Sequence, residues 1–152
     1  MRNLLYEPFL EATRNVFSLM LDLNDIVCSP VSELNARPCE LNVSIDVMGD
    51  LTGSVIYRFP GETSLKMVGI LSGMEFSAVD DFVASAMGEV ANIISGNVMT
   101  VLSNRKLNCD ILPPKVVEDA AYDAGNYDIR HAECLTTDAG DIELSILLNK
   151  AV

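Results

Sequence analysis

The sequence predicts an α+β domain in which long helices pack on an antiparallel β-sheet. Two stretches, residues 4–23 and 79–104, repeat apolar residues at helical spacing. Two others, residues 41–59 and 127–148, alternate apolar and polar residues on either side of turn residues, which is typical of β-hairpins. The chain has 152 residues, of which 49% are hydrophobic, so it is long enough to bury a substantial core. We therefore expect a single domain over residues 1–152.

The first helix is predicted over residues 4–23. Its proline, Pro8, falls in the opening turn, where a missing N–H is tolerated. Apolar residues recur near helical spacing, at Phe9, Ala12, Val16, Leu19 and Leu23. Residues 24–40 contain Pro30 and Pro38 and are expected to form a connecting loop.

A first hairpin and a short helix should follow. Residues 41–47 alternate strictly between apolar and polar types, residues 48–50 supply a turn, and residues 51–59 return as a second strand. A proline then ends the strand, and residues 62–72 are expected to form a short helix that Gly73 stops.

The longest helix is predicted over residues 79–104, with Asp80 or Asp81 as its capping residue. Its apolar arc contains Val83, Met87, Val90, Ala91, Ile94, Val98, Val101 and Leu102. Nearly opposite lies a narrow polar line of Asp81, Ser85, Glu89, Asn92, Gly96 and Ser103. Such a line is often only a solvated face. However, the helix has no lysine or arginine, and Gly88 and Gly96 each cost about 1 kcal/mol relative to alanine, so a small surface for docking is the better interpretation.

The last third of the chain should add a second hairpin. Residues 108–115 contain Pro113 and Pro114, residues 116–117 are a candidate short strand, and residues 118–126 are expected to form an acidic loop. Strands are then predicted over residues 127–136 and 141–148, around a turn at residues 138–140.

An internal repeat links the two hairpins. Residues 49–55 read GDLTGSV and residues 140–146 read GDIELSI, and each copy follows a helix and a proline-containing segment. This match predicts a pseudo-twofold helix–hairpin repeat, with half-repeats at about residues 4–59 and 79–149.

Composition and motifs exclude several classes of protein. Ten basic and 22 acidic residues give a net charge of −12, which opposes binding to nucleic acid or to an anionic membrane surface. Neither a secretory signal nor an apolar run of the ~18 residues needed to span a bilayer is present, and Cys28, Cys39, Cys109 and Cys134 are scattered, so we expect reduced thiols and a cytoplasmic location.

The chain also lacks the residues of a self-contained hydrolase. There is no phosphate-binding glycine loop and no metal-ligand spacing, so no metal site is expected. The only histidine, His131, falls in a predicted strand, where a packing role is the ordinary expectation. Glu89 and Asn92 alone are too few for an active site unless a partner supplies the rest.

The polar line of the long helix resembles a known signature. Ser85, Glu89 and Asn92 continue into the run Ile-Ile-Ser-Gly-Asn at residues 93–97, and Pro114 follows 22 positions after Asn92. This pattern is similar to that of the CheC/CheX/FliY family, whose members are phosphatases of phosphorylated CheY-type response regulators in bacterial chemotaxis. The similarity is greatest to the CheX branch and extends over the whole chain. The spacing favours Pro114 over its neighbour Pro113 as the family's proline.

The resemblance implies a CheC-like fold and a division of the chemistry between two proteins. A phosphorylated CheY-like receiver domain would supply the phospho-aspartate, a divalent ion and a lysine, so this chain would need no cofactor of its own. Asn92 would orient the attacking water, and Glu89 would contact the receiver lysine. The surface that binds the partner would include Asp81, Ser85, Gly88, Gly96 and Asn97. The resemblance also implies a homodimer.

Two further interpretations remain open. Glu11 and Asn15, on the first helix, resemble a degenerate copy of the pair Glu89 and Asn92 and are a candidate second site. Their spacing is i, i+4 and not i, i+3, and Arg14 is an unlike neighbour, so a surface or interface role is expected for them. As a whole, the chain could instead be a non-catalytic adaptor for a receiver domain or a flagellar-switch-like component. It could also be a structural homodimerisation domain in which the small-residue line is buried against its own copy.

Overall fold

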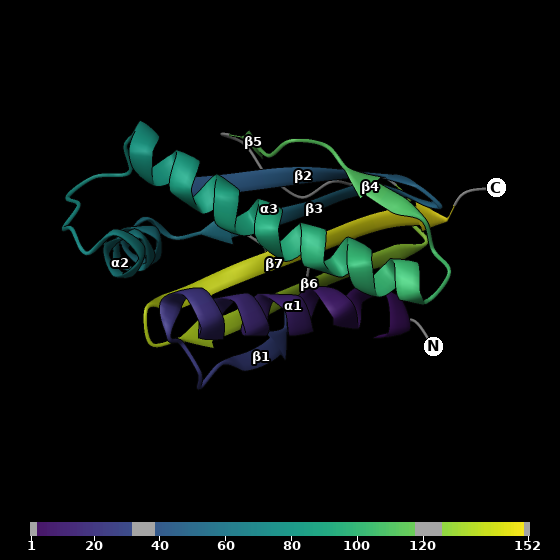
Figure 1. The fold of residues 1–152 in the computed structure, drawn as a ribbon, viewed down its shortest axis with the longest axis horizontal. Helices are drawn as coiled ribbons and strands as arrows, with labels where there is room; N and C mark the ends of the chain where they lie inside the picture. Colours follow the sequence, from purple (N-terminus) through teal and green to yellow (C-terminus); the bar gives the residue numbers. More distant parts are fainter. Residues whose placement is uncertain (1–2, 32–38, 118–125, 151–152) are drawn as a thin grey trace.

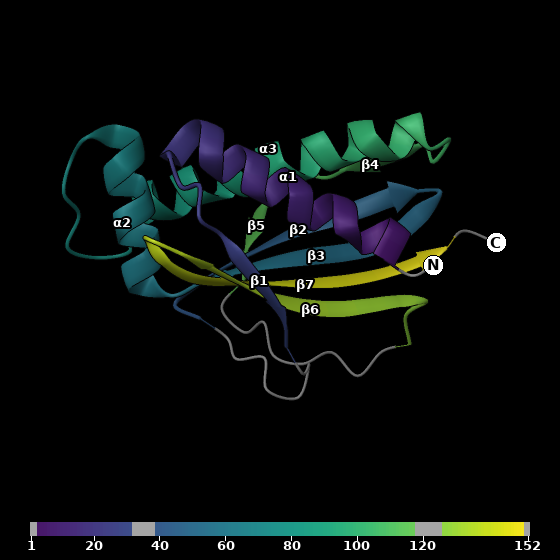
Figure 2. The same cartoon turned by 90° about the horizontal axis from the view of Figure 1, so that it is seen from below.

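The computed structural model describes residues 3–31, 39–117 and 126–150 and has the predicted α+β architecture. Two long helices, α1 (Asn3–Leu21) and α3 (Asp81–Asn104), lie side by side on one face of a β-sheet (Figure 1 and Figure 2). The short helix α2 (Gly61–Ser72) packs at one end of this layer. None of the described helices is long and apolar enough to cross a membrane.

The sheet is antiparallel throughout its described strands. These strands are β1 (Val27–Pro30), β2 (Leu41–Gly49), β3 (Leu51–Phe59), β4 (Cys109–Ile111), β5 (Lys115–Val116), β6 (Ile129–Thr137) and β7 (Gly140–Lys150). They are arranged in the order β1-β6-β7-β3-β2-β4, and β5 also pairs with β2. The order is palindromic, because exchanging β1 with β4, β6 with β2 and β7 with β3 reproduces it. Each half of the chain therefore adds its first strand to the hairpin of the other half.

The register between the central strands agrees with this symmetry. Val55 of β3 and Ile146 of β7 lie directly opposite each other. The same two residues are the last of the seven that match in the internal repeat. A twofold axis perpendicular to an antiparallel pair passes between opposite residues, so the sequence repeat and the strand register place the axis at the same point.

The core fills the space between the sheet and the two long helices. Alternate residues of the central strands face the helices, as the period of a strand requires, and are fully buried. Among them are Val43, Ile45, Val55, Tyr57, Leu144 and Ile146, which pack with Phe9, Phe17, Met87, Ile94 and Leu102 of the helices.

The structure corrects the sequence predictions at short strands. Residues 24–40 were expected to be a loop, but Val27–Pro30 pairs with β6 as an edge strand. Cys109–Ile111 was not predicted as a strand, but it pairs with β2. The strand predicted at residues 116–117 is observed one residue earlier, at Lys115–Val116, and also pairs with β2. These strands are two to four residues long, so their conformation depends on their neighbours in the sheet and not on local pattern. Most of the predicted acidic loop, residues 118–125, lies outside the described residues.

Candidate functional site

Helix α3 is fixed at its start and at its middle. The side chain of Asp80 caps the helix, because its Oδ1 accepts a hydrogen bond of 2.9 Å from the N–H of Val83. Further along, the hydroxyl groups of Ser95 and Tyr57 are hydrogen-bonded at 2.8 Å in the core, which joins α3 to β3. This pair was not predicted from the sequence, because a serine on an apolar helix face gives no sign of its distant partner.

Glu89 and Asn92 lie on the outer face of α3, one turn apart. Glu89 is exposed and Asn92 is partly exposed. Within the part of the chain that the structure describes, no hydrogen bond or ion pair holds either side chain. The carboxylate and the amide are therefore both available to another molecule.

Pro114 borders this site, and its position corrects the expectation for Gly88. Gly88 was expected on the partner-binding surface, but it is buried, and a Cβ atom there would lie 3.8 Å from Cγ of Pro114. Gly88 thus faces a neighbour within the chain, and a Cβ atom there would be in ordinary van der Waals contact with Pro114. The next residue, Lys115, fixes the segment through an ion pair of 2.7 Å between its Nζ and Oδ2 of Asp46. Pro114 therefore lies next to α3 at the residue before Glu89.

The other predicted partner-binding residues divide into two groups. Asp81 and Ser85 are exposed on the same line as Glu89, and Gly96 continues that line towards the end of the helix. A Cβ atom at Gly96 would meet no atom of residues 3–31, 39–117 or 126–150 within 4 Å, so the line is flat and open towards them at this point. Asn97 is also exposed, but it lies about 140° around the helix axis from Asn92. Asn97 is about 80° from Glu89, so it lies at the edge of this face.

One exposed residue on this line was missed by the sequence analysis. Phe82 lies seven residues before Glu89 and is therefore on the same side of the helix. Its side chain is 55% exposed, and its ring stacks on that of Phe76 with centroids 5.3 Å apart. The helical phase could have identified it, because seven residues bring the helix back to the same side.

Helix α1 has no equivalent of the carboxylate–amide pair. Its buried face superimposes on that of α3 when Met87 is matched with Phe9 and Ile94 with Val16. Glu11 then takes the position of Glu89, but Arg14 takes that of Asn92. Glu11 and Asn15 are both exposed. A guanidinium group donates hydrogen bonds and accepts none, so it cannot replace an amide that must do both.

The described residues offer little other chemistry. No group of three or more potential ligands among them could hold a metal ion, and Cys28, Cys39, Cys109 and Cys134 are free thiols. Burial raises the pKa of Cys28, Cys39 and Cys134, so these thiols stay protonated.

His131 has a packing role, as predicted. Its ring stacks on that of Tyr6 with centroids 3.8 Å apart, and its Nε2 lies 2.6 Å from Oε1 of Glu133, whose side chain is nearly buried. These contacts join α1 to β6 and do not face Glu89 or Asn92, which lie on the outer side of α3.

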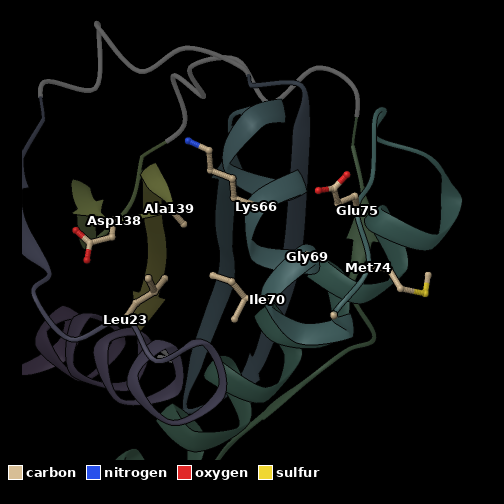
Figure 3. Close-up of a pocket in the computed structure, with 9 residues that line it drawn as sticks. Leu23, Lys66, Gly69, Ile70, Met74, Glu75, Asp138 and Ala139 are labelled. Carbon is tan, nitrogen blue, oxygen red and sulfur yellow. The ribbon is translucent and has the colours of Figure 1, made fainter.

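A pocket of about 440 Å³ lies elsewhere in the molecule, between α2 and the turn that joins β6 to β7 (Figure 3). Its lining consists of Leu23, Lys66, Gly69, Ile70, Gly73, Met74, Glu75, Asp138 and Ala139. None of these residues belongs to α3, so the pocket is separate from Glu89 and Asn92.

Comparison with known proteins identifies the chain's relatives. The family model for the chemotaxis phosphatase CheX matches residues 41–137, a range that contains α3 and Pro114. The CheY-P phosphatase CheX of Thermotoga maritima is 38% identical over 81 residues. That alignment covers 53% of this chain and 52% of the relative, so it spans about half of the relative's length.

Two solved structures are similar over nearly the whole chain. The first is the CheX–CheY–BeF3–Mg complex from Borrelia burgdorferi, with a TM-score of 0.81 and 27% identity, covering 96% of this chain and 98% of the other. The second is a chemotactic CheC-like protein from Shewanella oneidensis, with a TM-score of 0.82 and 20% identity, covering 98% of this chain and 100% of the other. They confirm the predicted CheC-like fold. Because the family model also matches more than half of the chain, this protein belongs to the CheX family of chemotaxis phosphatases.

Proposed function

We propose that this chain is a phosphatase that removes the phosphoryl group from the aspartate of a CheY-like receiver domain. The observation that supports it most directly is the pair of Glu89 and Asn92, which lie one turn apart on an open helix face and have no partner among the described residues. Membership of the CheX family and the similarity to a chain solved in a CheX–CheY complex agree with this assignment.

The proposed chemistry is one of positioning. Phosphoryl transfer passes through a loose transition state, so a correctly placed water needs little covalent assistance. The amide of Asn92 donates and accepts hydrogen bonds, and it would hold the water in line with the phosphorus atom without acting as a base. The receiver would supply the phospho-aspartate and the divalent ion, so this chain would need no cofactor of its own.

Glu89 would fix the register of the two proteins. Its carboxylate would pair with a receiver lysine, and a charge-assisted hydrogen bond of this kind strengthens when docking excludes water. The line formed by Asp81, Ser85, Glu89 and Gly96 contains two carboxylates and no basic residue, which suits a partner with a basic site. The protein would act in the cytoplasm, where such regulators operate, and it would form a homodimer.

The test is the lifetime of the aspartyl phosphate on each CheY-like protein of the host. The wild-type protein, added in substoichiometric amounts, should shorten that lifetime. Asn92→Ala should reduce kcat by about 100-fold, because the water loses its orientation, while binding to a BeF3-activated receiver changes by less than about threefold. Asn104→Ala, which removes an exposed amide from the last residue of α3, is the matched control and should behave as wild type.

The outcomes separate the three candidate functions. Unchanged lifetimes together with measurable binding would leave the non-catalytic adaptor. No binding to any receiver, together with self-association that is lost when Gly96 is replaced by a bulky residue, would favour the homodimerisation domain. A dimer by itself would not discriminate, since a phosphatase of this family is also expected to be one.

A further inference from the structure

We propose that Phe82 is an apolar anchor for the receiver domain, so that the docking surface has an apolar contact as well as the polar pair. This inference rests on the proposed function, because the partner is the same receiver that Glu89 and Asn92 would contact. It assigns to the first turn of α3 a contribution to affinity that is separate from catalysis.

The ring of Phe82 is exposed and yet held in place. Its side chain is 55% exposed, whereas every other exposed residue of α3, a helix that the structure describes in full, is polar. The interplanar angle to Phe76 is 12°, so the two rings are nearly parallel, and Phe76 is itself packed against the core. A ring that is already immobilised loses little conformational entropy on binding, which is why rigid aromatic residues are frequent hot spots of interfaces.

Phe82 lies within the area that such a partner would cover. It lies about 20° around the helix axis from Glu89 and about 10.5 Å along the axis. A standard interface covers about 800 Å² on each partner, which corresponds to a disc with a radius of roughly 16 Å. A receiver centred on Glu89 would therefore cover Phe82 as well as Asn92.

The surroundings of Phe82 favour a protein over a lipid surface. The adjacent residues Asp80 and Asp81 are acidic, and so is Glu75, next to the stacked Phe76. This charge would oppose insertion of the ring into an anionic membrane. A single exposed ring between carboxylates fits a protein surface that presents an apolar side chain near basic groups. We therefore expect an apolar residue of the receiver beside its phosphorylation site to contact Phe82.

The experiment separates affinity from turnover. Steady-state kinetics with a phosphorylated receiver, and titration of the same receiver carrying BeF3 and Mg²⁺, are measured for wild type, Phe82→Ala and Phe82→Leu. Phe82→Ala should raise KM and Kd by about 30-fold with kcat unchanged, which corresponds to the ~2 kcal/mol lost with a hot-spot side chain. Phe82→Leu, which keeps apolar area without the ring, should be intermediate. Leu19→Ala, at an 86% exposed apolar residue of α1, is the control and should match wild type.

Each outcome is decisive for one of the two proposals. Unchanged KM and Kd in Phe82→Ala would overturn the role of Phe82 and leave the phosphatase intact. Weaker binding by this variant to a receiver that the wild type binds without hydrolysing would support the anchor and overturn the catalytic function. If Phe82→Ala lowers the melting temperature and Phe82→Leu binds the receiver with the wild-type Kd, the weaker binding of the alanine variant comes from damage to the fold. That result would also overturn the aromatic anchor.

Discussion

Gly96 lowers the stability of α3, and its contacts in the described structure do not explain why a glycine is there. It lies in the interior of α3, where glycine is about 1 kcal/mol less favourable than alanine. A Cβ atom there would meet nothing within 4 Å among the described residues, so none of these neighbours requires the small residue. Gly88, in contrast, lies against Pro114. The low profile of Gly96 therefore supports the proposed docking of a second molecule on this face.

The variant Gly96→Ala should stabilise the fold and weaken docking. We expect the free energy of unfolding to rise by about 1 kcal/mol, since the helix gains propensity without a clash. At the same time, KM for the phosphorylated receiver should rise several-fold, because the added methyl group would hold the two backbones apart. Urea unfolding and steady-state kinetics check the two effects. An alanine variant that is more stable and keeps the wild-type KM would show that Gly96 lies outside the interface.

At this scale the sequence was informative where a residue's role depends on its own helix. The spacing of Ser85, Glu89 and Asn92 predicted their common face, and all three lie on the outer side of α3. Gly88 could not be placed correctly, because its burial depends on Pro114, which follows 26 residues later. The stacking of Phe82 on Phe76 was likewise invisible, since it requires the path of the connection between α2 and α3.

The element on which the site depends is α3, and its attachment to the sheet includes one buried polar contact. Burial raises the pKa of Tyr57, whose hydroxyl group is hydrogen-bonded to that of Ser95. A raised pKa in the folded state means that the neutral phenol stabilises the fold fully below the unfolded value of about 10. This stabilisation is lost as the pH rises above that value, by about 1.4 kcal/mol per pH unit until the folded pKa is reached.

The variant Tyr57→Phe should therefore change stability in opposite directions at neutral and at alkaline pH. At pH 7 it should cost about 1 kcal/mol, the net value of a hydrogen bond, since Ser95 can bond back to a carbonyl of its own helix. Above about pH 10 the difference from wild type should shrink and then reverse, because phenylalanine does not ionise. Urea unfolding from pH 7 to 11 measures both. Parallel curves for the two proteins would contradict a buried, neutral Tyr57.

The long helices and the hairpins were predictable, whereas the short edge strands β1 and β4 were not. Helix α3 was expected from residue 79 and begins at Asp81, a small difference that arises because Asp80 is its cap. The hairpin of β2 and β3 was predicted from its alternating residues to within two residues at either end. Strands β1 and β4 have only four and three residues, and each pairs with a strand from the other half of the chain. No local pattern can report such distant pairing.

At the scale of the whole molecule, the palindromic sheet makes the two halves depend on each other. The first half ends with β3 and the second begins with α3. Separated halves would each lose an edge strand and the other half's long helix, and each would expose apolar residues of the central strands β3 and β7. The internal repeat predicted the pseudo-twofold relation, because it aligns Val55 with Ile146. It could not predict the exchange of β1 and β4, which depends on how the halves pack.

We expect the intact chain to unfold in one transition. Far-UV circular dichroism and tyrosine fluorescence should give coincident urea curves, since no described part of the core belongs to one half alone. Fragments 1–77 and 78–152 should each lack a cooperative transition when studied separately. Two resolved transitions, or a fragment that unfolds cooperatively by itself, would show that the halves are independent folding units.

The segment between the two halves links them covalently. Helix α2 has no counterpart in the palindrome, and together with its flanking residues it is the covalent tether of what is otherwise a dimer of two helix–hairpin units. A short tether gives its two ends an effective concentration in the millimolar range. The intact chain thus folds at any dilution. Its severed halves would first have to associate, which costs free energy because translational freedom is lost.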